Sequence, residues 1–146
     1  MNTYRQVYLD LQEKHRQEIN EFPIAYAFDE KQLQEALLKL GATKDECVTI
    51  FGHGDIVKKE NAGKFLDMLK RHTAEVKELM KDENFAEEAF LYEMDNHEYC
   101  INWSGDEDVL DCFGLNYDSL EKEGLLPAYL RARRRHMDYA LENGWI

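Results

Sequence analysis

Apolar residues recur every three or four positions over most of this chain, and that spacing places them on one face of a helix. It predicts six helical segments, over residues 1–20, 29–41, 61–80, 84–94, 106–113 and 127–144. Asn61 and Asn84 are the predicted N-caps of the third and fourth segments. Gly41, Gly114 and Gly144 stand at three helix ends, where glycine adopts left-handed backbone angles without a steric penalty.

Four short segments do not follow the helical spacing, namely 22–28, 47–51, 55–59 and 97–103. In 22–28 large side chains alternate with small ones, which is typical of a strand with a helix on its small-residue face. Segment 47–51 is rich in strand-forming residues, although Thr43 and Glu46 before it form a capping-box pattern, and we expect a short turn followed by a strand. The turn Gly52-His53-Gly54 should let 55–59 return as an antiparallel partner.

Together these segments predict an α+β fold in which about five to six helices pack on a small antiparallel sheet. The 146 residues have the length of one domain, so we expect a single domain over residues 1–146. We expect His15, His72 and His136 at surface or boundary positions. The last helix is predicted to bury a stripe of large apolar side chains: Leu126, Leu130, Met137 and Leu141.

Acidic residues are concentrated in one part of the chain. Residues 82–123 contain 14 acids and a single base, Lys122, in a chain whose formal net charge is −12. This charge argues against direct binding to nucleic acid or to an anionic membrane, because both need a basic surface. The basic counterweight is a group of arginines on the last predicted helix: Arg131, Arg133, Arg134 and Arg135.

Two interpretations of the acidic segment remain open. It is either a solvated face, partly neutralised by those arginines within the fold, or a surface that binds a basic partner protein. In the second case its carboxylates would take positions that DNA phosphates occupy on the same partner. The predicted partner-binding residues are Glu87, Glu88, Asp95, Glu98, Asp106, Glu107, Asp108 and Asp111.

Candidates for metal binding or catalysis are weaker. His97 and Cys100, with Cys112 and His136 further along, contain zinc-ligand residue types. Structural zinc sites usually show paired short spacings, and the interval between Cys100 and Cys112 is wide, so we expect no metal, no cofactor and no catalytic residue. The alternative is a small-ligand or metal-binding enzyme that uses His97 and Cys100.

The three cysteines and the polar N-terminus suggest a compartment. An odd number of widely spaced cysteines suits a reducing cytosol, and the first 20 residues lack the apolar core of a signal peptide. We therefore expect a cytoplasmic protein with no membrane partner. A homodimer is also expected, because aromatic side chains are enriched at interfaces and four are candidates for exposure. These are Tyr4, Tyr8, Trp103 and Trp145.

Four stretches carry a family resemblance: MNTYRQVYLDLQEK, FPIAYAF, FGHGD and MDNHEYCINW. They resemble an uncharacterised family of small acidic proteins found on phages, plasmids and other mobile elements of gut Firmicutes. The strand followed by DEKQLQEALLKLGA has a weaker, architectural likeness to antirestriction DNA mimics. The resemblance implies a non-enzymatic accessory protein that inhibits a host defence nuclease of the CRISPR or restriction type. It implies no catalytic residues.

Overall fold

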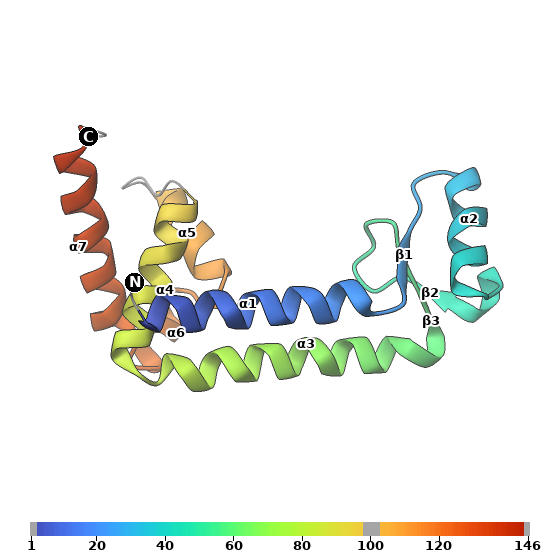
Figure 1. Ribbon diagram of the computed structural model, residues 1–146, viewed down its shortest axis with the longest axis horizontal. Coiled ribbons are helices and arrows are strands. Elements are labelled where there is room, and N and C mark those ends of the chain that lie inside the picture. Colours follow the sequence, from blue (N-terminus) through green and yellow to red (C-terminus); the bar gives the residue numbers. More distant parts are fainter. Residues whose placement is uncertain (1–2, 98–102, 145–146) are drawn as a thin grey trace. The chain divides into compact units, whose positions relative to one another are not determined.

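The computed structural model describes residues 3–97 and 103–144. These residues form seven α-helices and a three-stranded antiparallel sheet, which confirms the predicted α+β class (Figure 1). The chain divides into two compact units. Unit 1 comprises Met1–Gln12 and Thr73–Ile146, and unit 2 comprises Glu13–His72. Helices α1 (Thr3–Glu21) and α3 (Lys59–Met80) contribute residues to both units, and the single domain stays a prediction.

Unit 2 contains the sheet, in the order β1-β3-β2. Its elements are β1 (Ile24–Tyr26), α2 (Glu30–Leu40), the 3-10 turn η1 (Lys44–Glu46), β2 (Cys47–Val48) and β3 (Asp55–Lys58). Strand β3 pairs antiparallel with both neighbours, with Val57 opposite Ile24 on one side and Val48 on the other. The three strands predicted in this region therefore exist, although each is shorter than its segment.

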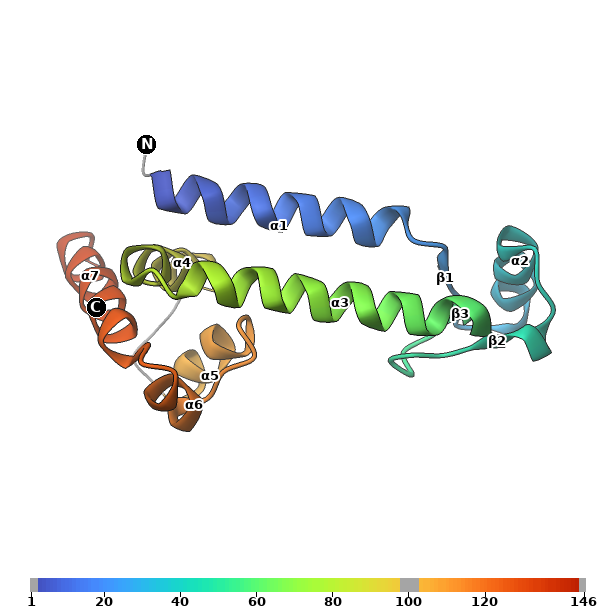
Figure 2. The same cartoon turned by 90° about the horizontal axis from the view of Figure 1, so that it is seen from below.

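Helix α2 lies against β1, as Figure 2 also shows. The Asp29 side chain caps it by accepting a hydrogen bond from the Gln32 backbone N–H, and Gly41 ends it at φ 64°. Ala25 of β1 and Ala36 of α2 are both buried, whereas Tyr26 is exposed. The strand thus turns its small side chain toward the interior, as its alternating pattern predicts.

Unit 1 is built on four helices besides the ends of α1 and α3: α4 (Glu83–Asn96), α5 (Trp103–Asp111), α6 (Tyr117–Lys122) and α7 (Leu126–Glu142). Their largest fully buried side chains form one hydrophobic core, which includes Phe90, Met94, Leu110, Leu120 and Tyr129. Phe90 packs edge to face against Tyr129, with the ring centroids 5.1 Å apart. Helices α4 and α7 therefore form the main packing interface of unit 1.

Several predicted boundaries in the helices are wrong. Helix α3 begins at Lys59, directly after β3, so Asn61 lies inside its first turn. Helix α4 begins at Glu83, because the Asp82 carboxylate accepts hydrogen bonds from the backbone N–H groups at 84 and 85 and thus provides the cap. The ends of the predicted strand 97–103 are also wrong, since His97 caps α4 and Trp103 begins α5. Residues 98–102 lie outside the described residues, and α6 was not predicted.

The predicted buried stripe of α7 is wrong in part, since Leu126 packs partly buried against the core and Met137 is half-buried. Leu130 and Leu141 are exposed, and the buried face is formed instead by Ala128, Tyr129, Ala132, His136 and Ala140. Alanines on this face let the backbone of α7 approach its neighbour closely, and α4 offers two fully buried alanines of its own, Ala86 and Ala89. The leucine pattern therefore does not by itself identify the buried face of α7, because this helix packs through small residues.

The three helical histidines are buried, not at the surface, because each ring has a partner. The rings of His15 and His72 stack with centroids 3.8 Å apart. His72 Nε2 lies 3.2 Å from Glu18 Oε2. His136 Nδ1 lies 2.9 Å from Asp95 Oδ1.

Within the described part of the chain, no helix has the length and apolar character needed to cross a bilayer.

Candidate functional site

The predicted partner-binding residues that the structure describes all belong to unit 1, but they do not form one exposed surface. Glu87, Glu88 and Asp95 lie on α4, and the others lie on α5. Glu98 is outside the described residues. The two helices differ in what surrounds their carboxylates.

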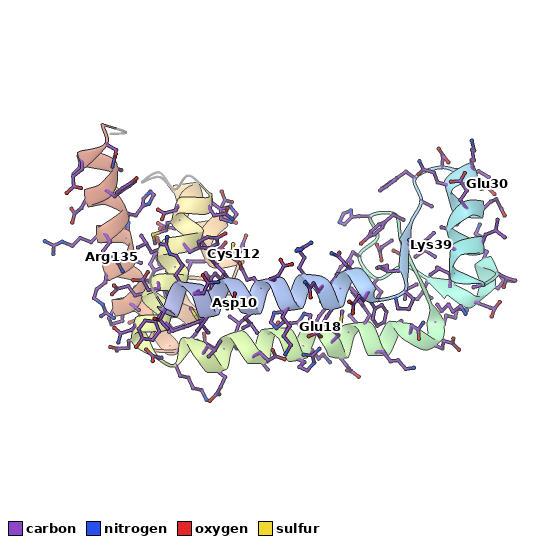
Figure 3. All side chains as sticks on the ribbon, in the orientation of Figure 1. Asp10, Glu18, Glu30, Lys39, Cys112 and Arg135 are labelled. Atoms are coloured by element: carbon purple, nitrogen blue, oxygen red, sulfur yellow. The ribbon has the colours of Figure 1, made fainter. Side chains whose placement is uncertain are left out.

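On α4, Glu87 and Glu88 pair with arginines of α7, and Asp95 pairs with Arg5 of α1 at 3.5 Å. Glu87 accepts hydrogen bonds from Arg131 Nε at 2.5 Å and from Arg135 Nη1 at 2.8 Å. Arg135, labelled in Figure 3, also donates to Glu88 at 2.6 Å. Glu88 is buried, so the prediction that it offers an exposed carboxylate is wrong. The contacts of Glu87 and Glu88 therefore fit the first interpretation, in which arginines of the last helix neutralise the acidic segment.

Asp106 on α5 is also buried, which is a second correction. Its carboxylate accepts hydrogen bonds from the hydroxyls of Tyr117 on α6 and Tyr129 on α7. Burial, followed by these contacts with Asp106, raises the pKa of Tyr117 to about 12. Asp106 therefore links three helices. A buried carboxylate needs hydrogen-bond donors, and the two tyrosine hydroxyls provide them within the fold.

Three acids of α5 remain exposed, and we call them the α5 acidic face: Glu107, Asp108 and Asp111. Asp111 lies four residues after Glu107 and three after Asp108, so all three point to one side of the helix. Within residues 3–97 and 103–144, none of the three forms an ion pair. The neighbouring acids on and after α6 are partly compensated, since Lys122 pairs with Asp118 at 2.9 Å and Lys77 with Glu123 at 3.7 Å.

A second cluster, which we call the Glu93 cluster, joins Glu93, His97 and Cys112. Glu93 lies in the last turn of α4, His97 is the C-cap of that helix, and Cys112 follows the last residue of α5. His97 Nε2 lies 3.3 Å from Glu93 Oε2 and 3.2 Å from Cys112 Sγ. Burial, followed by the neighbouring Glu93 carboxylate, raises the pKa of the Cys112 thiol to about 12.

The other oxygen of Glu93 is held from α1. The Tyr8 hydroxyl donates to Glu93 Oε1 at 3.2 Å, and Gln12 Nε2 lies 3.5 Å from the same atom. Tyr8 is buried, so it is not one of the exposed aromatics predicted for a dimer interface. Burial and the Glu93 charge both raise the pKa of the Tyr8 hydroxyl.

The sequence identified His97 as a candidate metal ligand but grouped it with other residues than the structure does. It joined His97 to Cys100, Cys112 and His136, whereas the structure brings together His97, Cys112 and Glu93. His136 contacts Asp95 instead, and Cys100 lies outside the described residues. The four-residue spacing of Glu93 and His97 could have revealed this pair only if the predicted helix 84–94 had been extended by one turn, because His97 falls in the predicted strand 97–103.

These features define a small α+β protein with a localised acidic face and a separate cluster of Glu, His and Cys side chains. Residues 7–136 match the model of a family of unknown function (DUF7659), and the chain therefore belongs to that family. This agrees with the predicted membership of an uncharacterised family. Neither the search of curated proteins nor the search of solved structures found a match.

Proposed function

We propose that this protein is a non-enzymatic interaction protein whose α5 acidic face binds a basic surface on a partner protein. The observation that carries the proposal is the contrast between two helices. Glu83, Glu87 and Glu88 of α4 are paired with arginines of α7, whereas the α5 acidic face is exposed and forms no ion pair with a described residue. Three carboxylates on one side of a helix produce a local negative potential that steers a basic partner toward it.

We further propose that the partner is a nucleic-acid-binding nuclease of a host defence system, and that the protein belongs to a phage or another mobile element. A groove that binds DNA presents lysine and arginine side chains to phosphates, and carboxylates can pair with the same side chains. Because the α5 acidic face contains only three carboxylates, it would mimic a short stretch of DNA phosphates. The resemblance to acidic proteins of mobile elements supports this choice of partner.

The proposal can be tested by removing the three charges together. The variant Glu107→Gln/Asp108→Asn/Asp111→Asn keeps the shape of each side chain, and its positions are exposed, so it should fold. A matched control, Glu35→Gln/Asp45→Asn/Asp67→Asn, changes the net charge equally at exposed positions of unit 2. Full-length wild type and both variants are immobilised and exposed to host extract, and bound proteins are identified by mass spectrometry.

We expect wild type and the unit 2 control to retain a basic nucleic-acid-binding protein, which is then purified and measured directly. The α5 variant should bind that protein at least about tenfold more weakly. Equal binding of the purified partner by wild type and the α5 variant, with circular dichroism showing both folded, would exclude the α5 acidic face as the binding surface. Recovery of no basic partner by wild type would count against the function itself.

A further inference from the structure

The Glu93 cluster contains three side chains of metal-ligand type whose donor atoms converge. One carboxylate oxygen of Glu93, one ring nitrogen of His97 and the Sγ atom of Cys112 all lie within 4.8 Å of one another. The two measured separations, 3.3 Å from His97 to Glu93 and 3.2 Å from His97 to Cys112, are close to those between ligands of tetrahedral zinc. Zinc bond lengths of about 2.0–2.3 Å place such ligands roughly 3.3–3.6 Å apart.

A bound cation would compensate the charge of Glu93. The Glu93 side chain is 4% exposed, and within the described chain its only basic neighbour is His97. No lysine or arginine among the described residues pairs with it, in contrast to the arginine-paired Glu87 and Glu88 on the same helix. A buried carboxylate requires compensation of its charge, because removal from water strongly disfavours the ionised form.

The second oxygen of Glu93 is oriented as in a metal site. Its Oε1 receives the Tyr8 hydroxyl at 3.2 Å and lies 3.5 Å from Gln12 Nε2, which leaves Oε2 directed to His97 and Cys112. Metal-binding carboxylates are usually fixed in this way by hydrogen bonds from outside the coordination shell. Glu93 lies in the last turn of α4 and His97 caps that helix, so the end of α4 brings both ligands to the same place.

We propose that Glu93, His97 and Cys112 form a binding site for a divalent transition-metal ion, with zinc as the best match to one oxygen, one nitrogen and one sulfur ligand. Three protein ligands leave a fourth position for water or another donor. A bound ion would link α4 to the residue that follows α5, and therefore stabilise the helices that carry the α5 acidic face. The site is independent of the acidic face, because no residue is shared.

The test uses the untagged full-length chain, stripped of metal and kept reduced. Zinc affinity is measured by competition with a chromophoric chelator, and Co²⁺ serves as a spectroscopic probe because a thiolate ligand gives a near-ultraviolet charge-transfer band. Cys112→Ser and His97→Gln remove ligands at exposed positions, so both variants should fold. Cys47→Ser and His53→Gln are matched controls, since both residues lie in unit 2 and outside the cluster.

We expect one Zn²⁺ per wild-type chain and a Co²⁺ band of thiolate type. Each ligand variant should bind zinc at least about 100-fold more weakly, which exceeds the usual effect of removing a residue outside the coordination shell. Cys112→Ser should also abolish the Co²⁺ band, while both controls keep zinc and band. Zinc binding by wild type no tighter than by folded Cys112→Ser would overturn the site, as would loss of the band in Cys47→Ser.

Discussion

Asp55 determines the conformation of the turn between β2 and β3. Its carboxylate accepts hydrogen bonds from the backbone N–H groups of Ile50 at 2.6 Å, Phe51 at 3.0 Å and His53 at 3.2 Å. The Thr49 hydroxyl donates to it at 3.1 Å. The segment FGHGD is therefore a structural turn around one buried carboxylate.

The same contacts make the stability of unit 2 depend on pH. Burial by itself raises the pKa of Asp55, but the backbone and hydroxyl donors outweigh it and lower the pKa from 3.8 to about 2. The folded state therefore favours the charged form, and this stabilisation is complete above about pH 4 and disappears as the pH falls toward 2. From the size of the shift, it amounts to about 2 kcal/mol.

Replacement Asp55→Asn should lower the free energy of unfolding by about 2 kcal/mol at neutral pH, because the amide cannot accept four donors as a carboxylate does. The difference from wild type should shrink at about pH 3, because Asp55 of the unfolded chain is then largely protonated and the preference of the folded state for the charged form contributes less. Urea unfolding at both pH values measures this. Asp67→Asn, at an exposed position of α3, is the control. A deficit of equal size at both pH values would show that the Asp55 charge is not the cause.

At the scale of elements, the face that a helix buries depends on its neighbour as much as on its own pattern. Helix α7 buries Ala132 fully and leaves Leu141 59% exposed, although hydrophobicity alone favours the opposite. The neighbouring α4 presents Ala86 and Ala89, and small residues on both helices allow close packing. This selection arises from the complementarity of two surfaces, which a single helix pattern does not contain.

Two substitutions on α7 distinguish the two faces. Ala132→Leu should lower the free energy of unfolding by about 1–3 kcal/mol, because the larger side chain has no space between closely packed helices. Leu141→Ala should change it by no more than about 0.5 kcal/mol, because that side chain is largely in solvent. Thermal and urea unfolding measure both. A larger loss of unfolding free energy from Leu141→Ala than from Ala132→Leu would show that the leucine stripe, and not the alanine face, is buried.

Local signals in the sequence predicted what depends on local chemistry. Asp29 and Gly41 bound α2 as expected, and the turn before β3 was placed correctly, because capping and left-handed backbone angles are decided within a few residues. Long-range contacts were missed. The burial of Glu88 depends on Arg135, 47 residues away, and that of Asp106 depends on Tyr129, 23 residues away. Partners so distant in the chain leave no local pattern.

For the whole molecule, the concentration of acids in 82–123 has more than one role. Part of the charge stabilises unit 1, through the arginine pairs of Glu87 and the tyrosine contacts of Asp106. Glu93 lies in the proposed metal site. Glu107, Asp108 and Asp111 of α5 are exposed without an ion pair to a described residue, and the proposed interaction surface is therefore smaller than the acidic segment. A small, strongly charged surface should act chiefly on the rate of encounter.

The rate of association with the purified basic partner, measured as a function of salt, tests this account most directly. Raising the salt from about 0.05 to 0.5 M shortens the screening length from more than 10 Å to less than 8 Å. Wild type should associate at least about tenfold more slowly across this range, with much less change in dissociation. Glu107→Gln/Asp108→Asn/Asp111→Asn should lose most of that dependence, and the unit 2 control should keep it. Equal salt dependence for wild type and the α5 variant would contradict the central role of the α5 acidic face.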